Sequence, residues 1–369
     1  MRILKLNLTT LVLTVLFSTS LYAQENNTIT TVAPFLNIVT DARAAAMGDV
    51  GVASSADGNA LFHNAAKMVF HKNEVTLGIN YTPWLRNLTD DIYVGNFTYQ
   101  QKIDERSAFG GGIKYFNYGE IEITQSGDSG TSSKGSPYEL ALDAAYSLKL
   151  SENYSMAVAL RYIRSDLSIT GTSISDIQPS NGFAVDISGY YVSNEMAFSE
   201  FNGVARAGFN ISNIGPKVSV LNSEGFLPTN LKLGGGFDFI VDDYNQLGLT
   251  LEFTKLLVPA VDGEDKNFIE GMISSFGDAP GGLKEELQEV TIGLGAEYLY
   301  NNAFAFRAGY FKENENKGNR NFFTLGAGFR ASSFNVDISY LASNSVVNNP
   351  LENTLRFSLS FDLGDIYEY

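Results

Sequence analysis

The chain has 369 residues, a formal net charge of −16 at neutral pH and no cysteine. The acidic balance makes nucleic acid an unfavourable partner, since phosphate binding requires clustered Lys and Arg. A sequence without cysteine has no disulfides, thiolate metal ligands, cysteine nucleophiles or lipoprotein attachment. No break in composition divides the chain, so one large unit is a simpler interpretation than several domains of about 150 residues each.

Residues 1–23 have the pattern of a signal peptide. Arg2 and Lys5 give a basic start, an apolar stretch follows from Leu6 to Phe17, and small residues lead to a cleavage site expected after Ala23. The alternative is a membrane anchor, but the apolar stretch is short for a helix that spans a bilayer. We therefore expect the mature protein to begin near residue 24.

The composition of residues 24–73 predicts a plug segment. The stretch from Val32 to Phe70 is rich in small residues and glycine and does not alternate between apolar and polar positions. Ahead of a series of strands, such a segment is a candidate plug inside a barrel, and a small periplasmic cap is the alternative. Both histidines, His63 and His71, fall here, and two histidines alone do not define a metal site. A triad of Ser, His and an acid in the wall would have no local base, so we predict no enzymatic activity, metal or cofactor.

Residues 74–369 predict a β-barrel. Between Tyr138 and Leu150, apolar residues fill every second position, and a period of two indicates a β-strand with one apolar face. The pattern recurs with aromatic residues near strand ends, which is typical of a barrel with lipid outside and water inside. The predicted strands are Glu74–Thr82, Asp91–Ile103, Arg106–Tyr118, Pro137–Leu150, Asn153–Ile169, Ser180–Ser193, Gly203–Asn213, Thr229–Ile240, Tyr244–Leu256, Gln288–Tyr300, Ala303–Glu313, Arg320–Ala331, Phe334–Ser343 and Glu352–Asp362. We therefore predict an all-β fold, a transmembrane outer-membrane β-barrel of about fourteen antiparallel strands with an N-terminal plug.

The predicted connections alternate between long and short along the chain, as in barrels that have long outer loops and short periplasmic turns. An even number of strands then leaves both termini on the periplasmic side. Asn194–Asn202 is an exception, because it is long for a periplasmic turn. We expect a multi-pass protein of the bacterial cell outer membrane, in contact with outer-membrane lipid.

The alternation also assigns a face to each side chain. On the strand expected over Asn153–Ile169, Val158 and Leu160 would face lipid, while Ala159 and Arg161 would face the lumen. The same parity places a set of charged residues inside: Asp143, Asp186, Asp238, Glu252, Glu297, Asp337, Lys149, Arg161, Lys232, Arg307, Arg330 and Arg356. A charge on the lipid face near the midplane costs about 2–4 kcal/mol, so this consistent parity supports the register. Their simplest role is to brace the wall and the plug, and the lining of a pore is the alternative.

Two outer loops carry apolar residues that are candidates for partner contact. Trp84 and Leu85 stand at a loop tip, where a position at the membrane interface would equally account for the tryptophan. In the longest loop, Phe268, Met272 and Phe276 recur at every fourth position, with Ile269 and Ile273 alongside, which predicts a short amphipathic helix. The residues predicted to bind a partner are Trp84, Leu85, Phe268, Ile269, Met272 and Phe276.

Several long stretches resemble the PorV family of outer-membrane barrels of the Bacteroidetes type IX secretion system, a distant relative of the FadL fatty-acid transporters. They include TDARAAAMGDVGVASSADGNALFHNAAK, YTPWLRNLTDDI, LPTNLKLGGGFDF and NPLENTLRFSLSF, and they extend from Thr40 to Phe361. Two departures stand out. His63-Asn64-Ala65 occupies a position where the family often has Trp-Asn-Pro, and the chain continues past Phe361 as DLGDIYEY.

The resemblance implies a FadL-like barrel with an N-terminal hatch, in agreement with the strand pattern, and a non-enzymatic role in protein secretion. Family members bind the C-terminal signal domain of secreted cargo at the translocon barrel, SprA or Sov, and deliver it to the PorU attachment complex. They also cover the lateral opening of the translocon, with an outer loop entering its pore. These partners are implied by the resemblance and not by the composition.

Two other functions stay open. A FadL-type channel for hydrophobic small molecules would use the plug and the apolar loops to capture a lipid-like ligand. A membrane-embedded hydrolase would require esterase activity. Loss of the gene would trap secreted proteins in the periplasm under the secretion hypothesis, and would abolish growth on fatty acids or aromatics under the channel hypothesis.

Overall fold

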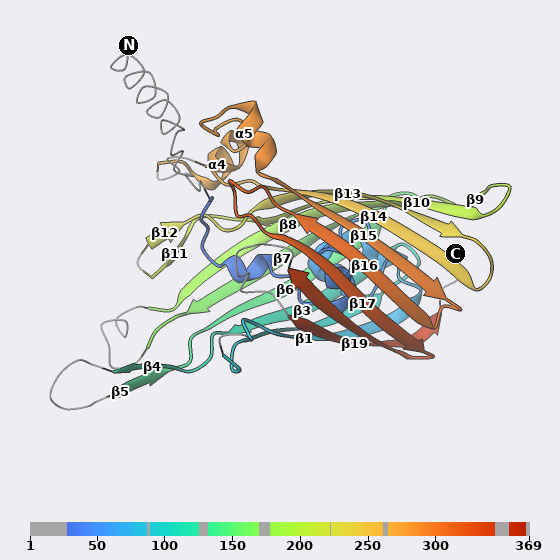
Figure 1. Ribbon diagram of the computed structural model, residues 1–369, viewed down its shortest axis with the longest axis horizontal. Coiled ribbons are helices and arrows are strands. Elements are labelled where there is room, and N and C mark those ends of the chain that lie inside the picture. The colour runs from blue at the N-terminus through green and yellow to red at the C-terminus, as the bar shows by residue number, and fades with distance from the viewer. Residues whose placement is uncertain are drawn as a thin grey trace, which may run out of the picture.

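The computed structural model describes residues 28–86, 89–124, 132–169, 178–221, 223–260, 265–343 and 354–366. Its main sheet contains 15 strands, and among the described residues fourteen of them close into an antiparallel ring when the two-residue β9 is left aside. The ring closes because the first strand pairs with the last, so that Leu77 lies opposite Phe361. Figure 1 shows the resulting barrel from the side. The predicted all-β barrel of about fourteen antiparallel strands is confirmed.

The ring strands follow one another around the barrel in chain order. They are β1 (Asn73–Pro83), β2 (Tyr93–Lys102), β3 (Ser107–Asn117), β6 (Tyr138–Lys149), β7 (Tyr154–Asp166), β8 (Ser180–Val192), β10 (Asn202–Ile214), β13 (Asn230–Ile240), β14 (Asn245–Leu256), β15 (Val290–Tyr300), β16 (Phe304–Lys312), β17 (Asn321–Ala331), β18 (Phe334–Ser343) and β19 (Leu355–Ile366). Each overlaps a strand predicted from the alternation of the sequence. β19 continues past Phe361 to Ile366, so the chain beyond that aromatic still belongs to the wall.

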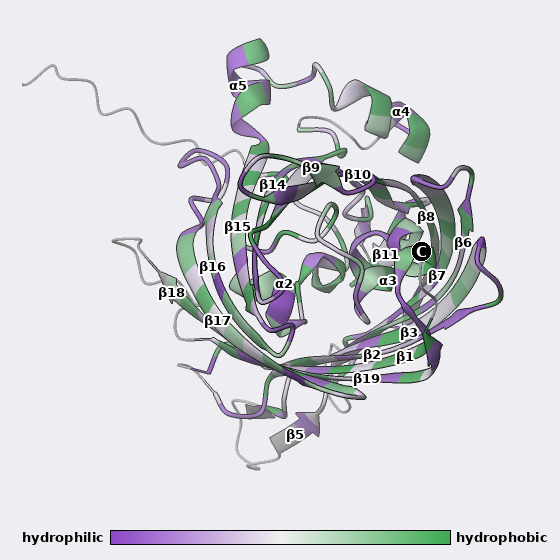
Figure 2. Cartoon of the chain, turned by 90° about the vertical axis from the view of Figure 1, so that its right-hand side faces the viewer, coloured by the Kyte–Doolittle hydropathy of each residue, from purple (hydrophilic) through white to green (hydrophobic). Residues whose placement is uncertain are grey.

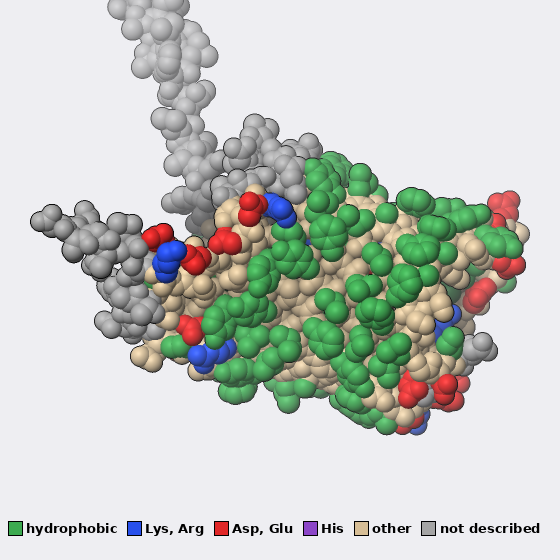
Figure 3. Space-filling view, turned by 90° about the horizontal axis from the view of Figure 1, so that it is seen from below, with side chains coloured by type: hydrophobic (Ala, Val, Ile, Leu, Met, Phe, Trp, Pro, Cys, Tyr) green, Lys and Arg blue, Asp and Glu red, His purple; other side chains and the backbone are tan. Residues whose placement is uncertain are grey.

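The wall has the predicted facing. Val158 and Leu160 of β7 are 50% and 61% exposed, whereas the alternate residues Ala159 and Arg161 are buried inside. Figure 3 shows apolar side chains over the middle of the wall and charged side chains toward its two ends. This distribution is expected where lipid surrounds the middle and water bathes the ends.

Three short hairpin extensions lengthen the connections. β4 (Ile121–Thr124) pairs with β5 (Ser132–Gly135), and β11 (Val218–Val220) pairs with β12 (Ser223–Gly225) in long loops. β9 (Met196–Ala197) pairs with the start of β10. The connection that is too long for a simple turn is therefore a hairpin tip, and stacking of Phe198 on Phe201 at 4.8 Å stabilises it.

We call residues 34–70 the hatch. The segment contains η1 (Pro34–Asn37), α2 (Ala42–Ala46), α3 (Ala60–His63) and η2 (Ala65–Phe70). Figure 2 shows α2 and α3 inside the ring of strands. Ala42, Ala44, Ala45 and Ala46 are all buried, because small side chains let the helix pack closely in the lumen. The expected signal peptide, residues 1–23, lies outside the described residues.

The two ends of the barrel differ. At the short-turn end lie the short β2–β3 turn, which contains Asp104 and Glu105, and the short β13–β14 turn. Asn73 pairs with Ile366 at the same end. At the long-loop end lie the β4–β5 and β11–β12 hairpins and the helices α4 (Phe268–Ser274) and α5 (Leu283–Gln288). No helix among the described residues is long and apolar enough to cross a bilayer.

Candidate functional site

An ion-paired network ties the hatch to one side of the wall. Arg43 of α2 contacts Asp57 of the hatch at 2.6 Å and Glu297 of β15 at 2.7 Å. Glu297 also accepts from Arg307 of β16 at 2.6 Å, and Arg307 reaches Asp337 of β18 at 2.6 Å. The network therefore links the hatch to three strands through groups that sequence parity had already placed inside.

A second attachment lies on β13 and β14. The carboxylate of Glu252 accepts the backbone N–H groups of Gly51 and Val52 at 2.7 and 2.9 Å, and pairs with Lys232 at 3.1 Å. Lys67 of η2 donates to the Gly51 carbonyl at 2.7 Å. The turn around Gly51 is thus held from the wall and from within the hatch, since its buried backbone groups need such partners.

The structure explains locally why His63-Asn64-Ala65 can stand where the resembling sequences often have Trp-Asn-Pro. His63 Nε2 lies 2.5 Å from Asp41 Oδ2, and Asp41 also caps α2 by accepting from the Ala44 amide at 2.8 Å. Asn64 donates to the carbonyls of Val52 and Gly189 at 2.8 and 3.0 Å. The histidine therefore fixes the start of α2 and the end of α3 against each other, and its role is structural.

Glycine permits the closest approach of hatch and wall. A Cβ atom on Gly309 of β16 would lie 2.0 Å from the Gly48 nitrogen. Gly48 itself has a φ of 73°, which glycine adopts without the strain of a side chain, and a Cβ there would lie 2.6 Å from the Tyr310 carbonyl oxygen. Backbone meets backbone at this contact, so neither position has room for a larger residue.

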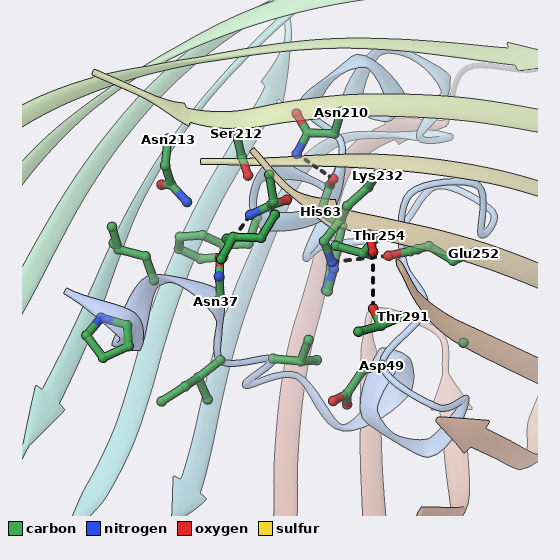
Figure 4. Close-up of a pocket in the computed structure, with 18 of the residues that line it drawn as sticks. Asn37, Asp49, His63, Asn210, Ser212, Asn213, Lys232, Glu252, Thr254 and Thr291 are labelled. Atoms are coloured by element: carbon green, nitrogen blue, oxygen red, sulfur yellow. Dashed lines mark hydrogen bonds and ion pairs between the residues drawn. The ribbon is translucent and has the colours of Figure 1, made fainter. Parts of the chain in front are cut away.

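A cavity of about 340 Å³ lies above the hatch at the long-loop end. Figure 4 shows Lys232, Glu252 and Asp49 around it, with Asn37 of the hatch opposite Asn210 and Asn213 of β10. Charged and amide side chains share this lining with apolar ones, among them Leu36, Ile38 and Phe311. The lining is therefore mixed, whereas sites for hydrocarbons are mostly apolar. We call it the mouth cavity.

The structure corrects the predicted exposure of Trp84 and Leu85. Both side chains are half-buried. The Trp84 ring meets Phe116 of β3 edge-on at 6.3 Å, and it packs on a buried cluster that includes Phe35 and Leu36 of the hatch. Trp84 has the inward parity of β1, like Thr82, so it continues the core of the mouth and does not form a free loop tip or a lipid-facing girdle.

The longest loop forms a helical overhang, which we define as residues 265–289. Asn267 caps α4 by accepting from the amides of Ile269 and Glu270, and the Glu270 side chain accepts from the Asn267 amide, which completes a capping box. The predicted short helix is therefore confirmed. Gly271 packs against Phe226, where a Cβ would lie 2.6 Å from the ring. Figure 2 shows α4 and α5 outside the outline of the ring.

The overhang exposes large apolar side chains, some of which the sequence singled out. Ile269 and Phe276 are 50% and 56% exposed, whereas Phe268 and Met272 are half-buried. Ile273, Leu283 and Leu287 are exposed by 66%, 76% and 66% and were not on the predicted list. The spacing of four between Leu283 and Leu287 was the available signal for α5, but Gly281-Gly282 before it obscured the helix.

Ion pairs hold the overhang to the barrel. Lys255 at the end of β14 contacts Glu286 and Glu289 at 2.9 and 2.6 Å, and Lys317 contacts Glu285 and Glu289 at 2.7 and 3.1 Å. Burial raises the pKa of Glu286, but hydrogen bonds from Lys255 and the Ala279 amide outweigh it, so the pKa lies below its usual value. α5 is thereby clamped through its acidic face, which leaves its leucines free.

A groove of about 430 Å³ runs along the lipid-facing side of β13 and β14. It forms because Gly235 has no side chain between Leu233 and Phe237, and Leu251 and Phe253 of β14 line its other side. The overhang follows directly from the end of β14. The groove and the overhang therefore lie on the same side of the barrel, one in the wall and the other at its long-loop end.

Comparison with solved structures agrees with this architecture. The Pseudomonas putida toluene transporter TodX has 12% sequence identity and a TM-score of 0.50, with 88% of this chain and 98% of that chain covered. A TodX deltaS2S3 mutant, a monoaromatic hydrocarbon channel, gives 12% and 0.52, with 87% and 97% covered. A Pseudomonas aeruginosa FadL homologue gives 12% and 0.46, with 91% and 99% covered. No curated protein sequence matches the chain.

The two TodX similarities show the fold alone, which is that of a FadL-like outer-membrane barrel, and the hatch fills the interior of this barrel. The family model described as type IX secretion system protein PorV matches residues 21–262. The chain therefore belongs to the PorV family of the type IX secretion system.

Proposed function

We propose that this protein binds the C-terminal signal domain of secreted cargo at the translocon barrel, SprA or Sov, and carries it to the PorU attachment complex. The observation that supports this most directly is the overhang, which holds five large apolar side chains outside the ring of strands. Exposed apolar patches of this kind mark sites of protein contact. A few such anchors within a standard interface of about 1,600 Å² suffice for specific binding.

The charge of the overhang favours a protein over a lipid headgroup. Residues 265–289 contain six acidic and two basic residues, a net charge of −4. Anionic headgroups would be repelled from this surface, whereas a protein with an apolar centre and a basic rim would complement it. Phe268, Ile269, Met272 and Phe276 stay proposed contact residues together with Ile273, Leu283 and Leu287. Trp84 and Leu85 would contribute through their exposed edges.

We also propose an orientation. The short-turn end, with the end of β19, faces the periplasm, and the long-loop end faces the outside of the cell, as in other outer-membrane barrels. The overhang then meets partners at the cell surface.

The alternative function is a FadL-type channel for hydrophobic small molecules, as for the transporters that share the fold. The mixed lining of the mouth cavity, with its charged side chains, supports this less, since sites for such ligands are mostly apolar. Uptake of a radiolabelled fatty acid or of toluene by cells with and without the gene separates the two functions.

The first prediction concerns the overhang. The double substitution Ile273→Ser and Leu287→Ser removes two exposed anchors, and each lost anchor costs about 1–3 kcal/mol of binding. We expect type IX cargo to accumulate in the periplasm, and the tagged barrel to lose its co-purifying translocon and attachment subunits.

Lys284→Ser is the matched control, because Lys284 is an exposed polar residue of the same helix α5. It should leave secretion and co-purification unchanged. Normal secretion by the double variant, at normal protein abundance, would contradict the assignment of the overhang as the contact surface.

A further inference from the structure

The segment that leads into the hatch lies at the long-loop end of the barrel. The Val32 amide donates to the Phe226 carbonyl at 3.0 Å. Phe226 follows β12 in a long loop. Ala33 is 3% exposed and belongs to a cluster with Phe116, Val218 and Leu227, which all lie near this end. Ile29 and Thr31 line the mouth cavity. We call residues 28–33 the strap.

The other end of the hatch leaves the lumen at the short-turn end. η2 ends at Phe70, and β1 begins at Asn73, which pairs with Ile366. The chain thus runs through the barrel lengthwise, from the strap at one end to β1 at the other. Figure 1 shows this path, with the blue segment rising from η1 toward α4 and the C-terminal end on the opposite side. Thr28 and Ile366, the first and last described residues, therefore lie toward opposite ends of the barrel.

The strap packs closely against the loops at the long-loop end of the barrel. A Cβ atom on Gly225 would lie 2.6 Å from a Val32 methyl carbon. Phe226 accepts a hydrogen bond from the Val32 amide through its carbonyl, and its ring lies against Gly271 of α4. Below it, Lys114 donates to the Leu36 and Ile38 carbonyls at 3.1 and 3.0 Å. Strap and overhang therefore share Phe226, and wall groups hold the chain just below.

We infer that the strap lies on the cell surface beside the overhang, as one wall of the mouth cavity, so that Thr28 is accessible from outside the cell. This rests on the orientation proposed above. The apolar band of such a barrel is about 25 Å tall, and the hatch fills the lumen below the strap. Thr28 is therefore separated from the periplasm by the hatch and by the height of the wall.

The cysteine-free sequence allows a direct test by single-cysteine labelling. Thr28→Cys, Lys284→Cys in the overhang and Glu105→Cys in the β2–β3 turn are all exposed positions. Intact cells are treated with a membrane-impermeant maleimide. We expect Thr28→Cys to react as fully as Lys284→Cys, and Glu105→Cys to react after the outer membrane is permeabilised. Reaction of Thr28→Cys only after permeabilisation overturns the inference.

A crosslink tests the position of the strap independently of orientation. The Gly225 Cβ position lies 3.8 Å from the Val32 Cβ, and disulfides join Cβ atoms about 3.5–4.5 Å apart. Val32→Cys with Gly225→Cys should lose both free thiols on mild oxidation, while Val32→Cys with Glu105→Cys should keep them. Retention of both thiols in the first pair overturns the inference. A crosslink together with labelled Glu105→Cys and unlabelled Lys284→Cys would instead overturn the proposed orientation.

Discussion

Individual side chains fix the hatch by pairing across large separations in sequence. Arg43 and Glu297 are 254 positions apart, yet they form a bidentate contact in the lumen. Parity along β15 places Glu297 inside, but nothing in the order of residues says which cation it meets. The same holds for Glu252, whose partners are two backbone amides of the hatch. The face on which a side chain lies can therefore be predicted from the local sequence, whereas the partner that it contacts cannot.

Close packing at Gly309 leads to a prediction about stability. Gly309→Ala adds a methyl group 2.0 Å from the Gly48 nitrogen, so the hatch or β16 must shift. Overpacking of this kind costs about 1–3 kcal/mol. We expect a lower unfolding temperature, measured by loss of β-sheet circular dichroism in detergent.

The control is Gly277→Ala in the overhang, where nothing lies within 4 Å of the added carbon. It should unfold at the wild-type temperature. Equal unfolding temperatures for both variants would show that the contact at Gly309 relaxes freely.

At the scale of elements, strands were predictable and the segments between and before them were less so. β7 and β14 are recognisable in the sequence because lipid on one face and the lumen on the other impose a strict period of two. The hatch has no such period, since its surroundings are wall on all sides, and its four short helices were not located individually. α4 was found from its apolar spacing. The exposure of Trp84 was predicted wrongly because the alternation of β1 between inward and outward side chains continues past Pro83, which places the tryptophan on the inward face.

The clamp on α5 predicts how the overhang responds to pH. The pKa of Glu286 is lowered, so its contribution is complete above the usual value of 4.5 and is lost as pH falls through the folded value. Burial lowers the pKa of Lys317, but hydrogen bonds from its amine to Glu285 and Glu289 outweigh it and raise the pKa. Its contribution is therefore complete below the usual value of 10.5 and is lost at higher pH. The clamp should be constant between these limits.

Hydrogen exchange of the α5 amides, corrected for the intrinsic rate, tests this clamp. We expect protection to be flat near neutral pH and to fall on acidification below pH 4.5. Glu286→Gln should weaken that fall, since the substituted side chain has no proton to gain. Full protection of α5 in the wild type at strongly acidic pH would contradict a clamp built on carboxylates.

For the whole molecule, the path of the hatch makes it a plug attached at both ends. The strap holds it at the mouth, and the connection to β1 holds it at the short-turn end. An ion pair to β15 and hydrogen bonds to β14 hold it between these points. A barrel filled in this way leaves its loops and rim as the surfaces open to other proteins, as the proposed function requires.

The last prediction tests whether the Arg43 network keeps the lumen closed. Arg43→Met leaves Asp57 without its cation and removes the contacts of the hatch to Glu297. Breaking a largely buried ion pair from one side costs on the order of 3 kcal/mol, and here that cost falls on the hatch while the hydrogen-bonded wall stays closed. We expect higher ion conductance in planar bilayers than for the wild type. Lys72→Met, an exposed position just before β1, is the control and should conduct like the wild type. Unchanged conductance of Arg43→Met would mean that the hydrogen bonds around Gly51 and Asn64 suffice to seat the hatch, and that the arginine serves the stability of α2 alone.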